Sequence, residues 1–340
     1  MGIFDPWVGL TEPSDSHTKR AHPVEFDLWV YRRPLTQSSK QLSPEHIHHA
    51  FNNNYRDGTC QDSLQNEDLK TPKPQGLAAC ATGGYELAGI PKIDDPYKKR
   101  QWQLEHMAGA FRVFARKGFT EGTAGHISVR DPVDPNTFWI NPLGVHFGML
   151  KASDMVHVNE EGQVIGGNKV AVNAAGFMIH SAIHKARPDI NAACHTHSVY
   201  GKAWSAFGKP LDLLNQDSCT FHGIQAVYES FGGVVLEAEE GEHIVTALGK
   251  EARVLILQNH GLLTAGGTVD EAAYLFTAME RTCEVQLLVD SAKWEKKLIG
   301  KEAAQYTANV NADPETLYAE FQPDLEFEIW QSRGELSKGN

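Results

Sequence analysis

The sequence predicts an α/β protein in which a mixed, mainly antiparallel β-sheet lies between helices as an α/β/α sandwich. Two observations lead to this fold class. Short apolar or alternating segments, typical of strands, are interspersed with segments of helical periodicity. The two kinds of segment do not alternate strictly, so the sequence does not follow the regular βαβ repeat that builds a parallel sheet.

Start and stop signals define the expected helices. Asp95 before Pro96 marks the beginning of a helix that ends before Gly118. Thr268 and Glu271 have the spacing of a capping box, and they open a long amphipathic helix over 268–294. Further helices are expected over 172–186, 197–207 and 238–250.

The expected strands are short and lie between Gly-rich or Pro-rich turns. The most apolar of them, "ARVLILQNHG", is read as one strand. The segments with strand character are 126–131, 137–142, 155–158, 163–166, 190–195, 232–237 and 252–261.

Three regions differ in character. Residues 1–94 form a polar arm without sustained periodicity, which we predict to be partly disordered. Residues 95–300 carry the folded domain, and residues 301–340 read as a polar, acidic C-terminal tail. The arm contains a cluster of histidines that we interpret as exposed residues, because no partner ligands accompany them: His46, His48 and His49.

Composition excludes several classes of function. The formal net charge of −12 disfavours non-specific binding to nucleic acid or an anionic membrane surface. The sequence has no apolar run of about 18 residues, and its first twenty residues lack the pattern of a signal peptide. Five scattered cysteines without a CxxC pair indicate free thiols and a cytoplasmic protein. Cys194 has no second cysteine at ligand spacing, which argues against a thiolate zinc site.

Histidines follow two of the predicted strands. His195 and His197 flank Thr196, and alternate side chains of a strand point to the same side, so both imidazoles can share one ion. His260 follows another apolar strand and precedes Gly261. Three neutral imidazoles with an open fourth position suit Zn²⁺, with Fe²⁺ or Mn²⁺ as alternatives.

These two histidine segments carry a resemblance to a known family. "ARPDINAACHTHSVYGKAWSAFG" and "LILQNHGLLTAGGTVDEAAYLF" resemble the class II aldolase/adducin domain family, and the likeness extends over about 100–295. The resemblance implies an α/β/α sandwich, a divalent ion on the three histidines, and a homotetramer with active sites between subunits. In the family's sugar-phosphate aldolases a glutamate transfers a proton, and backbone N–H groups and hydroxyls hold the phosphate.

The chain departs from the aldolase pattern at those last two elements. The position of the catalytic glutamate falls on Gly176, and the family's Gly-Asn-x-Ser segment reads 125–128 with His126 in place of asparagine. The family's Thr-Gly turn reads Leu143-Gly144, and its Ser-Ser pair falls on Ala174-Ala175. We therefore expect a substrate that is not a sugar phosphate. The substrate-binding positions that remain are Gly144, Ser128 and Gly176.

A substitute for the missing base is expected among three residues. His126 and His222 offer imidazoles, and Glu121 precedes the loop that holds the far end of the substrate in the family. For each of these histidines taken alone, a structural role is the favoured interpretation.

Three functions remain open. The first is a divalent-metal-dependent lyase that acts next to a carbonyl, by retro-aldol cleavage or decarboxylation. The second is an Fe(II)-dependent oxygenase, because three histidines with open positions also suit O₂ chemistry. The third is an adducin-like, non-enzymatic assembly protein, against which stand the complete histidine triad and a C-terminus, "GELSKGN", without a Lys-rich tail.

Overall fold

The computed structural model of the chain describes residues 76–81, 87–233 and 238–337. The histidine cluster of the arm and most of the expected strand at 232–237 lie outside these residues. The chain divides into two units, 1–65 and 66–340, and every described residue belongs to the second unit. None of the described helices combines the length and the apolar character needed to cross a bilayer.

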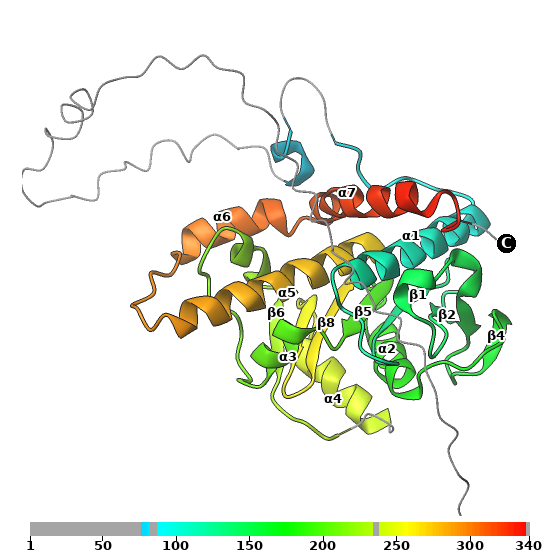
Figure 1. The fold of residues 1–340 in the computed structure, drawn as a ribbon, viewed down its shortest axis with the longest axis horizontal. Coiled ribbons are helices and arrows are strands. Elements are labelled where there is room, and N and C mark those ends of the chain that lie inside the picture. The colour runs from blue at the N-terminus through cyan, green and yellow to red at the C-terminus, as the bar shows by residue number, and fades with distance from the viewer. Residues whose placement is uncertain (1–75, 82–86, 234–237, 338–340) are drawn as a thin grey trace, which may run out of the picture. The chain divides into compact units, whose positions relative to one another are not determined.

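A single sheet of eight strands forms the centre of the unit, in the order β4-β3-β2-β1-β5-β8-β7-β6 (Figure 1). Strands β6 and β7 are parallel, and the other neighbours are antiparallel, which confirms a mixed, mainly antiparallel sheet. The strands are β1 (His126–Arg130), β2 (Phe138–Ile140), β3 (Val156–Val158), β4 (Val164–Gly167), β5 (Ala192–Thr196), β6 (Gln225–Tyr228), β7 (Val254–Leu257) and β8 (Gly261–Gly266).

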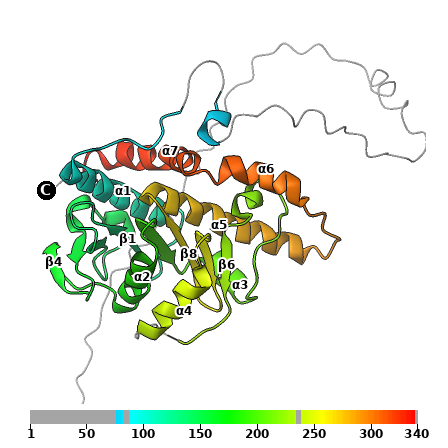
Figure 2. The same cartoon turned by 180° about the vertical axis from the view of Figure 1, so that it is seen from behind.

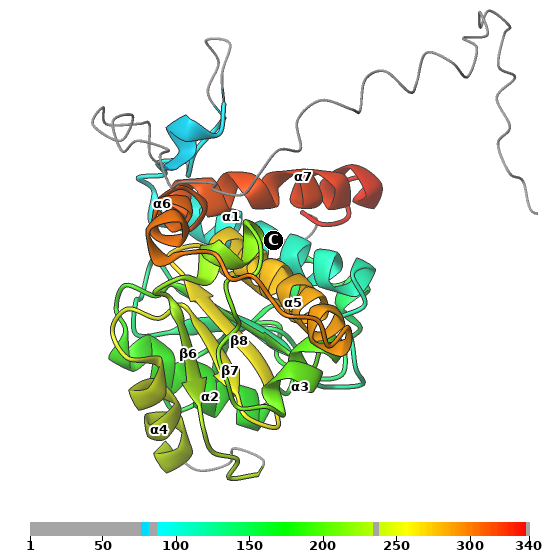
Figure 3. The same ribbon diagram turned by 90° about the vertical axis from the view of Figure 1, so that its left-hand side faces the viewer.

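Helices cover both faces of this sheet, so the expected α/β/α sandwich is confirmed. Helices α2 and α4 pack together on one face, whereas α1, α3 and α5 lie on the other and α7 covers α1 and α5 (Figures 2 and 3). The helices are α1 (Pro96–Arg116), α2 (Ala174–Ala186), α3 (Val199–Ser205), α4 (Ala238–Leu248), α5 (Val269–Ser291), α6 (Lys301–Asn311) and α7 (Pro314–Ser332).

The predicted helix starts are confirmed, with one difference. The Asp95 carboxylate accepts hydrogen bonds from the first-turn N–H groups of α1, and the Thr268 hydroxyl accepts one from the backbone N–H of Glu271. The Glu271 side chain does not complete a capping box. It accepts a hydrogen bond from the backbone N–H of Gly267 and pairs with Arg253, which joins the start of α5 to the sheet.

The segment expected as a polar tail forms α6 and α7. Leu317, Phe321 and Leu325 recur at every fourth position of α7 and are at most 1% exposed. This spacing places the three side chains on one face of the helix, and that face packs against α1 and α5. One face of α7 is therefore part of the core.

Candidate metal centre

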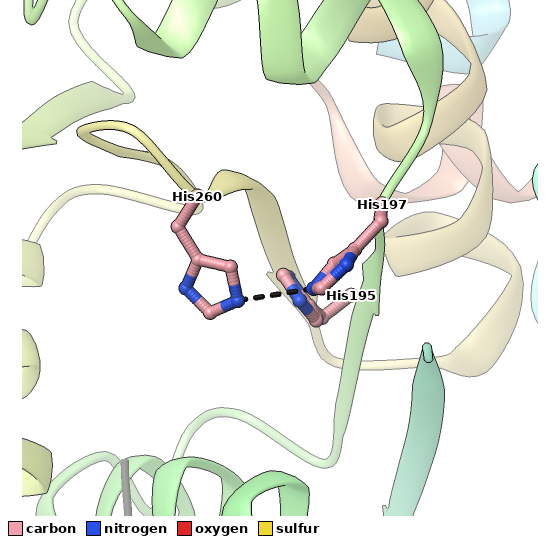
Figure 4. A group of neighbouring side chains, drawn as sticks. All are labelled: His195, His197 and His260. Atoms are coloured by element: carbon pink, nitrogen blue, oxygen red, sulfur yellow. Dashed lines mark hydrogen bonds between the residues drawn. The ribbon is translucent and has the colours of Figure 1, made fainter. Parts of the chain in front are cut away.

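The structure brings together the three histidines that the sequence singles out. Each of His195, His197 and His260 offers a ring nitrogen, and these nitrogens all lie within 4.8 Å of one another. Figure 4 shows the three rings converging. Nε2 of His260 and Nε2 of His197 are 3.1 Å apart. Such a cluster has the size of a first coordination sphere, since zinc–imidazole bonds are about 2.0 Å long.

Local chain geometry explains why the rings meet. His195 lies in β5, which pairs with β8 in antiparallel register, and His260 lies in the turn that joins β7 to β8. Asn259 adopts the left-handed conformation (φ 57°) that asparagine tolerates better than most residues, so the hairpin turns tightly. The turn thereby carries His260 to the end of β5.

Hydrogen bonding and burial prepare the rings to act as ligands. Nδ1 of His195 donates to the carbonyl oxygen of Leu262 at 2.7 Å, which leaves Nε2 of His195 without a proton. Burial and the neighbouring imidazole of His197 lower the pKa of His260 to about 4, and burial together with nearby imidazoles also lowers the pKa of His195. Neutral imidazoles are the form that binds a metal. The three residues therefore fit a divalent ion.

The Glu280 side chain, from α5, supports the turn that follows His197. Its carboxylate accepts hydrogen bonds from the Ser198 hydroxyl (2.5 Å) and from the backbone N–H groups of Tyr200 (2.8 Å) and Gly201 (2.7 Å). Glu280 is only 4% exposed, and burial raises its pKa. The carboxylate thus holds the start of α3 and, through it, the backbone next to a ligand.

His126 lies beside the cluster. Its backbone is paired with that of His195 across β1 and β5, and the two rings stack with their centroids 5.0 Å apart. A Cβ added to Gly176 would lie 2.3 Å from Cδ2 of His126, so the imidazole occupies the space next to residue 176. The two predicted site residues therefore depend on each other.

Ser128 lies behind this ring. It is 1% exposed, and its hydroxyl is 2.6 Å from Nδ1 of His180 and 2.7 Å from Nε2 of His184. The sequence predicts that Ser128 binds substrate directly. In the structure, its buried hydroxyl has two histidine side chains as hydrogen-bond partners instead. Sequence reasoning missed His184, although its spacing of four residues from His180 on one helix was a visible signal.

Glu121 and His222, the other two predicted catalytic residues, lie in different surroundings. The carboxylate of Glu121 is near enough to His197 to oppose the lowering of its pKa by burial, and it pairs with Lys202. The hydrogen bond from Lys202 lowers the pKa of Glu121, so the carboxylate is ionised at neutral pH. His222 faces α6, where it borders a surface hollow together with Tyr306, and no histidine of the triad borders that hollow. The proton-transfer role expected for His222 stays a prediction.

Gly144, the third predicted substrate-binding residue, lies in a surface turn. Its φ of 80° is left-handed, and no atom lies within 4 Å of an added Cβ. The neighbouring Leu143 side chain is 42% exposed. The turn therefore presents backbone and an apolar side chain to solvent.

Comparison with known proteins establishes the family. The model for the class II aldolase and adducin N-terminal domain matches residues 105–287. The chain belongs to this family, as the histidine segments indicate.

Several relatives are similar over most of the fold. The meiotically up-regulated gene 14 protein of Schizosaccharomyces pombe is 48% identical over 74% of this chain and 98% of its own length. Decarboxylase NovR of Streptomyces niveus is 41% identical over 59% of this chain and 75% of its own. The 4-hydroxy-3-prenylphenylpyruvate oxygenase/4-hydroxy-3-prenylbenzoate synthase of Streptomyces roseochromogenus is 40% identical over 59% and 73%, respectively.

A solved structure supports the same assignment. L-fuculose 1-phosphate aldolase from Glaciozyma antarctica has a TM-score of 0.67 and 42% sequence identity. The similarity extends over 73% of this chain and 97% of that chain.

Proposed function

We propose that this protein is a divalent-metal-dependent lyase that cleaves or forms a C–C bond next to a carbonyl group of a small molecule, by retro-aldol reaction or decarboxylation. The observation that carries the proposal is the convergence of His195, His197 and His260, with Nε2 of His195 left bare by the bond to Leu262. The relative named as a decarboxylase and the structure named as an aldolase support the same reaction class.

We assign separate roles to the triad and to the residues beside it. A divalent ion on the three imidazoles, Zn²⁺ in our proposal, supplies a Lewis acid for the carbonyl oxygen. His126 stands beside the triad and is assigned to proton transfer, with Glu121 as the alternative. Glu121 is paired with Lys202, which lowers the pKa of its carboxyl group.

The substrate that we propose is not a sugar phosphate. At positions where the family's aldolases carry phosphate-binding hydroxyls, this chain has Leu143, Ala174 and Ala175. Leu143 and Ala174 are exposed, so they offer an apolar surface to a bound molecule. Such a surface suits a less charged substrate.

Assembly and location complete the proposal. We propose a homotetramer, as is frequent in the family, and its mass in solution by light scattering is the test. The four described cysteines, Cys80, Cys194, Cys219 and Cys283, are all free thiols, which supports a cytoplasmic location.

A second candidate is an Fe(II)-dependent oxygenase. It is favoured by the relative whose name includes an oxygenase activity and which is 40% identical to this chain. Three imidazoles with open positions suit iron as well as zinc. The identity of the metal and the uptake of O₂ distinguish the two candidates.

The test is metal content, measured by mass spectrometry on untagged protein purified without chelator and without air. We expect about one ion per chain, and His195→Ala should lose it. The matched control is His243→Ala, because His243 is an exposed histidine of α4. Full retention of metal by His195→Ala would refute the site, and no metal even after reconstitution would favour a non-enzymatic, adducin-like assembly protein.

A further inference from the structure

A chain of four hydrogen bonds links the backbone of Ile190 to His126 through His184, Ser128 and His180. The first acceptor of this chain determines which atom donates in each of the bonds. The carbonyl oxygen of Ile190 lies 3.2 Å from Nδ1 of His184 and can only accept. Nδ1 of His184 therefore carries the proton, and Nε2 of the neutral ring is bare. The Ser128 hydroxyl, 2.7 Å from that Nε2, donates its hydrogen bond to it.

The same reasoning continues to the metal centre. Because the Ser128 proton is directed to His184, the Ser128 oxygen accepts from Nδ1 of His180 at 2.6 Å. Nε2 of His180 is then bare and accepts from Nδ1 of His126 at 2.7 Å. Burial lowers the pKa of His180 and, to about 3, that of His184, which keeps these two imidazoles neutral at pH 7. The neutral His126 ring then has its one proton on Nδ1. The last nitrogen of the chain, Nε2 of His126, is left without a proton.

This bare nitrogen lies next to the triad. The His126 ring stacks on His195, and a Cβ added to Gly176 would lie 2.6 Å from Nε2 of His126. The Nε2 edge of the ring therefore lies next to residue 176, in the space that a side chain there would take. Within the described part of the chain, His126 makes its side-chain hydrogen bond through Nδ1 alone.

We propose that His126 is a specificity-determining residue, which accepts a hydrogen bond from a substrate hydroxyl beside the metal and disfavours a phosphate or carboxylate oxygen there. The inference rests on the proposed function, since it places the substrate at the triad. A bare imidazole nitrogen and an anionic oxygen both bring lone pairs and no proton, so neither satisfies the other in buried surroundings. His180, Ser128 and His184 are positioning residues that act through His126.

The tautomer is measured directly by ¹⁵N NMR of histidine-labelled protein at pH 7, with each ring assigned by substitution. In the wild type we expect a proton on Nδ1 and none on Nε2 of His126, with and without zinc. Ser128→Ala should break the chain and give His126 a mixture of tautomers, whereas Ser128→Thr keeps the hydroxyl and should restore the single form. A protonated Nε2 of His126 in the wild type would overturn the inference.

Ser181→Ala is the matched control for the broken chain. Ser181 lies next to His180 on α2, and among the described residues its hydroxyl donates to the carbonyl oxygen of Met178 alone, at 3.4 Å. The tautomer of His126 should be the same in this variant as in the wild type. A change as large as that in Ser128→Ala would show that general loosening of α2, rather than the hydrogen-bond chain, determines the tautomer.

Selectivity is tested with inorganic phosphate as the probe on zinc-loaded protein. His126→Gln puts an amide that can donate near the place of Nε2, so it should bind phosphate about tenfold more tightly than the wild type. Equal or weaker binding would overturn the proposed selectivity. Zinc content is measured on the same samples. Failure to hold zinc refutes the proposed function, whereas the tautomer in metal-free protein tests the hydrogen-bond chain independently.

Discussion

Removal of the Glu280 carboxylate should weaken both the fold and the metal centre. In Glu280→Ala, the Ser198 hydroxyl and the backbone N–H groups of Tyr200 and Gly201 lose their common acceptor. Each donor left unsatisfied in buried surroundings costs about 1 kcal/mol or more. The three together lead us to expect a loss of about 3 kcal/mol in the free energy of unfolding. Because this turn follows His197, zinc affinity should also fall by roughly 10- to 100-fold.

Urea unfolding and competition with a zinc-binding dye measure the two effects of Glu280→Ala. Glu280→Gln keeps one acceptor oxygen and should lie between the alanine variant and the wild type. Glu242→Ala is the control, because Glu242 is an exposed residue of α4 and should change neither quantity. A loss below about 1 kcal/mol in Glu280→Ala, together with unchanged zinc affinity, would show that the carboxylate does not support the ligand turn.

Three further predictions concern the site and its surroundings. Gly176→Ala should destabilise the protein by about 1–3 kcal/mol, because the new Cβ would overlap the His126 ring; the same change in a His126→Ala background should cost far less, as a double-mutant cycle in urea would measure. Burial lowers the pKa of His184 to about 3 from about 6.5 in the unfolded chain, so the unfolded state binds the extra proton and stability falls as the pH drops below 6.5. At pH 4.5 the loss in the free energy of unfolding that His184 causes is about 2.7 kcal/mol. Metal-free His184→Gln, which lacks this imidazole, should therefore lose about 2.7 kcal/mol less of its free energy of unfolding than the metal-free wild type between pH 7 and pH 4.5. Chelation should lower the melting temperature, since an ion at 100 times its Kd stabilises the folded state by about 2.7 kcal/mol, and His195→Ala should show no such response.

The triad is predictable from the sequence because each of its parts is local. The alternation of side chains along a strand brings His195 and His197 to one side, and this rule acts over three residues. The site of His260 depends on one turn. The run 252–261 is expected as a single strand, but the left-handed Asn259 turns the chain so that β8 begins at Gly261.

The supporting residues are harder to predict, because tertiary contacts decide their roles. Glu280 is far from His197 in the sequence. Its carboxylate reaches the turn that follows His197 only because α3 packs on α5. The helices at the C-terminus show a related difficulty. The overall composition of that segment is polar, and the apolar spacing of Leu317, Phe321 and Leu325 is the feature that marks α7 as part of the core.

The two departures from the aldolase pattern, at positions 126 and 176, lie in contact in the structure, although they are far apart in the sequence. A glycine at 176 leaves a gap in the first turn of α2, and the His126 imidazole lies in that gap, closer to an added Cβ than any real contact allows. A larger residue at 176 therefore requires His126 to move, and a movement of His126 breaks its bond to His180. The loss of the side chain at 176 and the hydrogen-bonded imidazole beside the triad thus depend on each other, which is why the coupling between the two substitutions is the measurement that tests this arrangement most directly.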